Sequence, residues 1–272
     1  MTPSSLDFLS QETIGIIGCG HLGRAIALEL VSRGYSSDRL RLSLSGKSRS
    51  SLQNIVDCGL HHCLAGNDEI CRDCSIIFIT IPPQSLPELR GLSFPQDTMV
   101  ISCMAGVPLQ AIRRILGVEA VRMMPSGPST IQEKRGITAI YPNNEVVIRI
   151  LRGLDLRVYR LLDEDLMHIF TVGVCLPAAF LESEDCDCAR EEACKYLSRL
   201  YPDFAEICSW ARNVLPVFET EEERRVHIGK MATKGGITEA IVESLRENDD
   251  LLMALEKGIK RSRDISSCYE GK

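Results

Sequence analysis

The first half of the chain alternates short apolar runs with amphipathic segments. Runs that are apolar on both faces are typical of buried parallel strands. The predicted strands cover residues 14–17, 40–44, 75–81, 98–103, 120–124, 137–141 and 157–161. Helical periodicity fills the intervals, for example in 25–34 and 109–116. Strands alternating with helices predict an α/β fold, a Rossmann-type doubly wound and mostly parallel sheet.

The pattern changes at the acidic segment 163–165, which suits the first turn of a helix. Helical periodicity then continues to the end of the chain. The predicted breaks are Pro177, Pro202, Pro216 and the pair Gly235-Gly236, and a single last helix is predicted from Ile237 to Ile259. We therefore expect two domains, a Rossmann domain at 1–162 and an all-helical domain at 163–272.

Three glycines follow the first strand at the spacing G-x-G-x-x-G, and a helix begins at once. Gly18 permits the tight turn, Gly20 lets a pyrophosphate approach the backbone, and Gly23 lets helix and strand pack closely. His21 and Leu22 border the same turn. This order predicts a dinucleotide site, because the amides at a helix start bind anions. The alternative is an ordinary β-α turn whose glycines serve packing.

The segment after the second strand indicates which dinucleotide binds. An NAD enzyme would place an acid there, but this chain has Ser45, Lys47, Ser48 and Arg49. Cations and hydroxyls suit a 2′-phosphate, so we predict NADP(H). The alternative is a solvated basic loop. Further cofactor contacts are assigned where later strands end, at Ile81, Pro82, Ala105 and Gly106.

Composition narrows the class of protein further. No apolar run is long enough to span a membrane, and the first eleven residues lack the apolar stretch of a signal peptide. The sequence has no basic stripe with interleaved aromatic residues, the pattern that would predict nucleic-acid binding. We expect a cytoplasmic protein with a small-molecule substrate.

Twelve cysteines are present, and most are expected to pack as small apolar groups. The chain is neither short nor secretory, which argues against a disulfide framework. Cys71 and Cys74 form a C-x-x-C that leaves a zinc site as an alternative, although a second such motif is missing. Cys186 and Cys188 are expected to be free thiols, and no metal is predicted.

Four segments together resemble pyrroline-5-carboxylate reductases, in the order found in that family. They are Gly18–Gly23, Ser102–Val107, Val121–Pro128 and Thr233–Thr238. The last is similar to the family's Ser-Pro-Gly-Gly-x-Thr. The resemblance implies a Rossmann domain followed by a helical domain that dimerises or assembles further, and hydride transfer from a nicotinamide to a cyclic imine.

The resemblance also implies substrate residues in the helical domain. Amides of Gly235 and Gly236 at a helix start would bind the substrate carboxylate, and Lys234 would add a charge. Thr238 would add a hydroxyl and is assigned to both substrate binding and catalysis, while Cys175 is assigned to substrate binding. A protonated imine is already electrophilic, so no strong base is required.

The chain departs from the family where the helical domain begins. The family's Ser-Gly-Ser-Gly-Pro-Ala-Tyr is replaced by Val174-Cys175-Leu176-Pro177 and its neighbours, which makes this region more apolar. The leading hypothesis is an NADPH-dependent reductase that converts pyrroline-5-carboxylate to proline. The alternatives are a related oxidoreductase that acts on another imine, a ketone or a deazaflavin, and a non-catalytic NADP-binding protein.

Overall fold

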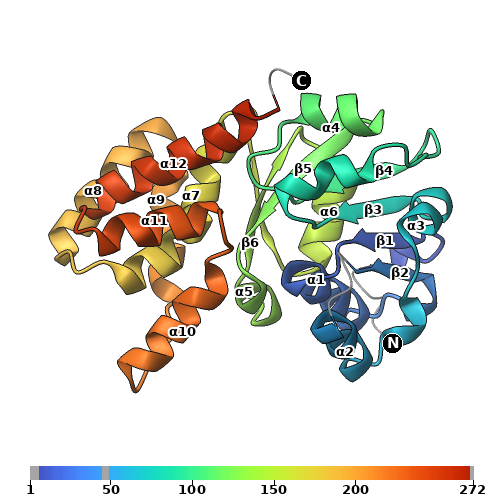
Figure 1. Ribbon diagram of the computed structural model, residues 1–272, viewed down its shortest axis with the longest axis horizontal. Helices are drawn as coiled ribbons and strands as arrows, with labels where there is room; N and C mark the ends of the chain where they lie inside the picture. The colour runs from blue at the N-terminus through green and yellow to red at the C-terminus, as the bar shows by residue number, and fades with distance from the viewer. Residues whose placement is uncertain (1–5, 45–48, 270–272) are drawn as a thin grey trace. The chain divides into compact units, whose positions relative to one another are not determined.

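The computed structural model describes residues 6–44 and 49–269, with residues 49 and 50 described by their backbone alone. The chain divides into two compact units, Met1–Leu162 and Asp163–Lys272. Strands and sheet belong to the first unit, and the described part of the second unit is helical (Figure 1).

The first unit is built on a sheet with the strand order β2-β1-β3-β4-β5-β6-β7. Neighbouring strands are parallel except β5 and β6, which are antiparallel. The strands are β1 Ile14–Ile17, β2 Leu40–Ser43, β3 Ile76–Ile79, β4 Met99–Ser102, β5 Ala120–Pro125, β6 Ile137–Tyr141 and β7 Arg157–Arg160. The predicted fold class, a Rossmann-type and mostly parallel sheet, is confirmed.

Helices cover this sheet because alternate strand residues are apolar on each face. One face shares a core with α1, α5 and α6 through residues such as Ile16, Ile26 and Ile148. On the other face α3 lies so close that a Cβ at Gly15 would meet Ile70 at 2.4 Å. The helices of this unit are α1 His21–Ser32, α2 Arg49–Asp57, α3 Asn67–Asp73, α4 Leu109–Leu116, α5 Pro128–Gln132 and α6 Glu145–Gly153.

The second unit packs around one buried helix, α7. Gly173 of α7 lets α9 approach, because a Cβ there would lie 2.8 Å from Ile207. Gly258 of α12 plays the same part against α11, since its Cβ would lie 2.7 Å from Ile241. The helices are α7 Leu166–Glu182, α8 Asp187–Leu200, α9 Phe204–Asn213, α10 Glu221–Met231, α11 Ile237–Arg246 and α12 Leu251–Ser267.

The predicted break at Pro177 is wrong. This proline lies inside α7, which continues to Glu182. A proline inside a helix costs about 3 kcal/mol through its missing N–H and its steric clash. Residues on both sides of it, including Leu176 and Ala178, are buried against the other helices. Tertiary packing of an almost wholly buried helix outweighs that local cost.

Among the described residues, no helix has the length and hydropathy needed to cross a membrane.

The single last helix predicted from Ile237 is also wrong, because the structure divides it into α11 and α12. Asn248 takes a left-handed conformation with φ of 68°, which ends the first helix. The side chain of Asp250 then accepts a hydrogen bond from Met253 N at 2.8 Å and caps the second helix. The apolar periodicity continues across this turn, so the pattern alone does not reveal the break.

Candidate functional site

The carboxyl ends of β1, β3 and β4 meet at one edge of the sheet. Ile17 is in register with Ile79, and Ile79 with Ser102. The Thr80 N–H donates to the carbonyl of Ile17 at 2.8 Å, and the Cys103 N–H donates to the carbonyl of Ile79 at 2.9 Å. The loops that carry the predicted cofactor residues therefore leave the sheet side by side. Doubly wound folds bind nucleotides at this edge, where the strand order reverses beside β1.

Gly18 and Gly23 are glycines for internal reasons. Gly18 has a φ of 90°, and a Cβ there would lie 2.4 Å from a methyl group of Ile81. At Gly23 a Cβ would lie 2.6 Å from the hydroxyl of Thr80 and 3.0 Å from the carbonyl of Gly18. That hydroxyl also donates to the Gly18 carbonyl at 2.9 Å. The turn and the close packing of α1 on β1 thus account for these two positions.

Gly20 has no such internal reason to be glycine. It caps α1 with a negative φ of −78°, and no side chain caps the helix. A Cβ at Gly20 would meet nothing nearer than the carbonyl of Gly18 at 3.9 Å. The missing side chain therefore leaves the start of α1 open from outside. A pyrophosphate fits this opening, because the amides and the dipole of the helix start favour an anion.

The end of β2 is tied to the glycine turn by Ser43, a buried residue that the sequence analysis did not select. Its hydroxyl accepts from Gly18 N at 3.3 Å, and its carbonyl accepts from Cys19 N at 2.7 Å. The predicted phosphate-binding residues Ser45, Lys47 and Ser48 lie outside the described residues, as does the side chain of Arg49.

The other predicted cofactor residues border the same edge. His21 is exposed at the first position of α1, and Leu22 follows it half-buried. Ile81 is buried against Gly18, and Pro82 precedes the 3-10 helix Pro83–Leu89. Ala105 is half-buried and Gly106 has a φ of 75° in the turn after β4.

In the second unit the structure brings Cys175 and Thr238 together. The Cys175 sulfur lies 3.2 Å from the Thr238 hydroxyl, joining α7 to α11. The same thiol donates to the carbonyl of Thr171 at 3.1 Å. Burial raises the pKa of Cys175 to about 11, more than the hydrogen bond to Thr238 lowers it. The thiol is therefore protonated at neutral pH and acts as a small packing group beside the threonine.

The glycine turn before α11 differs from the expectation that its amides are free. The Gly235 N–H donates to Oε2 of Glu239 at 2.5 Å, and the Gly236 N–H donates to the carbonyl of Thr233 at 2.8 Å. Gly235 has a φ of 71°, which explains this glycine. The expectation that both amides are free is therefore wrong. The carboxylate of Glu239, four residues after Gly235, already accepts the hydrogen bond from the Gly235 amide.

Arg261 of α12 is a second residue that sequence reasoning missed at this turn. Its Nε and Nη2 donate to the carbonyl of Gly235 at 3.0 and 2.6 Å. Lys234, the residue before Gly235, is exposed. No sequence signal joins Arg261 to Gly235, because the contact spans 26 positions between a turn and a helix.

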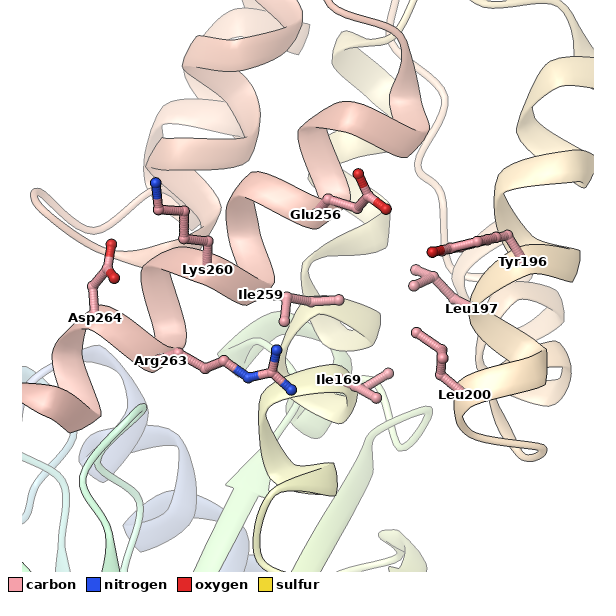
Figure 2. A pocket seen from close by; sticks show the side chains of 9 residues that line it. All are labelled: Ile169, Tyr196, Leu197, Leu200, Glu256, Ile259, Lys260, Arg263 and Asp264. Atoms are coloured by element: carbon pink, nitrogen blue, oxygen red, sulfur yellow. The ribbon is translucent and has the colours of Figure 1, made fainter.

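A groove also lies on the second unit, with a volume of about 410 Å³. Figure 2 shows Ile259 and Arg263 of α12 and Ile169 of α7 facing Leu197 and Leu200 of α8. Arg263 is paired with Asp165 at 2.9 Å. The groove is separate from the contact between Cys175 and Thr238, whose residues do not line it.

The cysteines are in part as expected. Cys194 and Cys208 form a disulfide between α8 and α9, which the sequence analysis did not anticipate. Burial raises the pKa of Cys71 to about 12 and of Cys74 to about 11, which opposes the thiolate form that zinc requires. In the part of the chain that the structure describes, no group of three metal-binding side chains comes together.

Residues 13–106 match the family model described as "NADP oxidoreductase coenzyme F420-dependent". Pyrroline-5-carboxylate reductase 1 of Dictyostelium discoideum is 29% identical over 138 residues, which cover 48% of this chain and 24% of that protein. Pyrroline-5-carboxylate reductase of Escherichia coli strain K12 is 28% identical over 139 residues, 49% of this chain and 50% of that protein. About half of the chain is therefore similar in sequence to pyrroline-5-carboxylate reductases. The resemblance predicted from the four sequence segments is confirmed.

The match to these pyrroline-5-carboxylate reductases spans at most about half of their length. Solved structures extend the likeness of fold to 94% of this chain. They include the pyrroline-5-carboxylate reductase of Coxiella burnetii (TM-score 0.57, 20% identity, 98% of that chain) and that of Plasmodium falciparum with NADP bound (TM-score 0.57, 18% identity, 99% of that chain). A prephenate dehydrogenase from A. aeolicus has a TM-score of 0.50 at 16% identity, over 93% of this chain and 97% of that one. The fold is therefore shared by enzymes with different substrates.

Proposed function

We propose that this chain is an NADPH-dependent oxidoreductase whose cofactor lies at the glycine turn after β1. Gly20 carries the proposal, because its missing side chain opens the start of α1 and has no internal packing reason. The amides there would hold the pyrophosphate, and Ser45, Lys47, Ser48 and Arg49 would hold the 2′-phosphate. A bound nicotinamide would supply the hydride. The NADP named in the matching family model and in one structural neighbour supports this choice.

The substrate we propose is a cyclic imine, with pyrroline-5-carboxylate reduced to proline as the first reaction to test. The relatives that match about half of the chain are named for that reaction. In the second unit Thr238 would bind the substrate through its hydroxyl, with Cys175 as the wall behind it. A protonated imine accepts hydride without a strong base, so binding and the exclusion of water are what these residues contribute. The family resemblance also implies a homodimer, which stays a prediction. Measuring the molecular mass of the protein in solution tests it.

A steady-state assay tests this reaction. With NADPH and pyrroline-5-carboxylate at millimolar concentration, we expect oxidation of NADPH that depends on the substrate and yields proline. Absence of turnover would contradict the proposed substrate. If NADPH still binds tightly and no imine, ketone or deazaflavin is turned over, the chain is a non-catalytic NADP-binding protein. Turnover of another member of that panel identifies the related oxidoreductase instead.

A second candidate substrate, an imine without a carboxylate, is favoured by Glu239. Its carboxylate accepts the hydrogen bond from Gly235 N that a substrate carboxylate would otherwise take. Two carboxylates at one amide repel each other, so an anionic substrate must displace the side chain. Arg261 donates to the carbonyl on the same glycine and holds the turn in place.

Replacing Glu239 with glutamine separates the two candidates. The change removes the negative charge and keeps the shape of the side chain. We expect KM for pyrroline-5-carboxylate to fall about tenfold, equivalent to about 1.4 kcal/mol. KM for 1-pyrroline, the same ring without the carboxylate, should stay unchanged. Glu243→Gln, one turn later and exposed on α11, is the matched control. Equal shifts in KM for both imines would contradict a role for the charge of Glu239.

A further inference from the structure

Two exposed cysteines lie at the start of α8, outside the site described above. Cys186 is the residue before the helix, and Cys188 is in its first turn. The backbone before them is held in place at two points. Arg190 Nη2 donates to the carbonyl of Ser183 at 2.6 Å, and the carboxylate of Asp185 accepts from Leu251 N at 2.7 Å. The two thiols are therefore open to solvent on an anchored segment.

The local hydrogen bonds make the two thiols different. The backbone N–H of Ala189 and then the thiol of Cys188 donate to the Cys186 sulfur, and they hold the pKa of Cys186 below its usual range. The pKa of Cys188 is raised, because its proton is shared with Cys186 and a second negative charge would lie beside the first. Cys186 is thus the thiol that ionises first, and Cys188 is the one that keeps its proton.

Other thiols in this chain lack this combination. Burial raises the pKa of Cys19 and Cys103 to about 12. Cys268 is exposed like Cys186, but it follows the carboxyl end of α12 and does not precede a helix. Cys186 lies at the amino end of α8, where the helix dipole favours a thiolate. The chain therefore carries its own control for the effect of position on a helix.

We propose that Cys186 and Cys188 form a dithiol site that reduces small aliphatic disulfides carrying positive charge. The charge preference follows from the acidic residues around the pair. They are Glu184, Asp185, Asp187, Glu191 and Glu192. The same segment, 184–195, contains two cations, Arg190, which donates to the carbonyl of Ser183, and Lys195, which pairs with Glu191 at 2.9 Å, so acids outnumber cations there. An anionic disulfide is repelled by this surface, and a cationic one is attracted.

The exchange proceeds in two balanced steps with cystamine as the disulfide. The Cys186 thiolate attacks one sulfur, the S–S bond of cystamine breaks, and the departing half takes up a proton as cysteamine. Cys188 then loses its proton and attacks the Cys186 sulfur of the mixed disulfide, which releases the second half. One cystamine is reduced to two molecules of cysteamine, and the two thiols of the chain are oxidised to one disulfide. The site does not depend on the proposed reductase activity.

The experiment uses the full chain without NADPH, mixed with cystamine, and maps the modified cysteines by mass spectrometry after alkylation. We expect release of two thiols for each chain and a peptide that carries a Cys186–Cys188 disulfide. Cys188→Ser should stop at the mixed disulfide on Cys186 after one thiol is released. Cys186→Ser should react roughly tenfold more slowly, the loss expected when a thiol of lowered pKa is removed. Cys268→Ser should react like the unchanged chain.

A second measurement tests the charge preference of the site. It distinguishes this preference from the reactivity of any thiol that is exposed to solvent. At low ionic strength cystamine should react faster than the anionic glutathione disulfide, and added salt should narrow the difference. Equal rates with both disulfides would overturn the charge preference. Reaction mainly at Cys268, or a stable mixed disulfide on Cys186 while Cys188 is intact, would overturn the dithiol site. Thermal unfolding of each variant checks that the exposed substitutions leave the fold unchanged.

Discussion

Replacing Gly20 with valine is expected to remove tight NADPH binding while the protein stays folded. The new side chain would occupy the opening at the start of α1, where the amides would otherwise face the pyrophosphate. Inside the protein the Cβ meets nothing nearer than the carbonyl of Gly18 at 3.9 Å, and the φ of Gly20 is negative, at −78°. We expect NADPH affinity to fall at least about 100-fold, or roughly 2.7 kcal/mol. Titration of NADPH fluorescence measures the loss, and the free energy of unfolding should fall by only about 1 kcal/mol, because valine is a poorer N-cap than glycine.

Gly23→Val is the matched control on the same turn. Its Cβ would lie 2.6 Å from the hydroxyl of Thr80 and 3.0 Å from the backbone of Gly18. Overpacking of this kind costs about 1–3 kcal/mol. Denaturant unfolding without cofactor should therefore place Gly23→Val well below Gly20→Val in stability. Unchanged NADPH binding in Gly20→Val would contradict the proposed cofactor site, and equal destabilisation by both changes would contradict the account of the turn.

The second large effect is expected at the segment after β2. Substituting Lys47 and Arg49 together with alanine should weaken NADPH binding by several kcal/mol at most, at about 1.5–3 kcal/mol for each charged hydrogen bond. NADH has no 2′-phosphate, so its affinity should stay nearly the same. Calorimetric titration with both dinucleotides gives the two dissociation constants directly.

Arg39→Ala provides the comparison for this pair. Arg39 lies at the amino end of β2, where its Nη1 donates to the carbonyl of Gln11 at 2.6 Å. That end of the strand is opposite the edge where the cofactor loops leave the sheet. The control should leave the ratio of NADPH to NADH affinity unchanged. Equal losses of both cofactors in the Lys47 and Arg49 variant would show that the segment does not read the 2′-phosphate.

Much of the first unit follows from the sequence because its signals are local. A buried parallel strand needs a run of apolar residues. The turn after β1 needs glycines at a fixed spacing within six consecutive residues. The predicted fold class and the family resemblance both rest on such short segments. Helix boundaries were less secure, as Pro177 and the turn at Asn248 demonstrate. There, packing against other helices and a side-chain cap decide the outcome.

The candidate site likewise has features that follow from local sequence and features that depend on contacts between distant segments. The sequence by itself determined the glycine spacing after β1, the absence of an acid after β2 and the Gly235-Gly236 pair. Only the tertiary structure distinguished Gly20, which is open, from Gly18 and Gly23, which are enclosed. It alone placed Cys175 against Thr238, 63 positions apart, and Arg261 on the Gly235 carbonyl. Residue identity fixes which groups a turn contains, but contacts between distant segments decide which of those groups are already occupied.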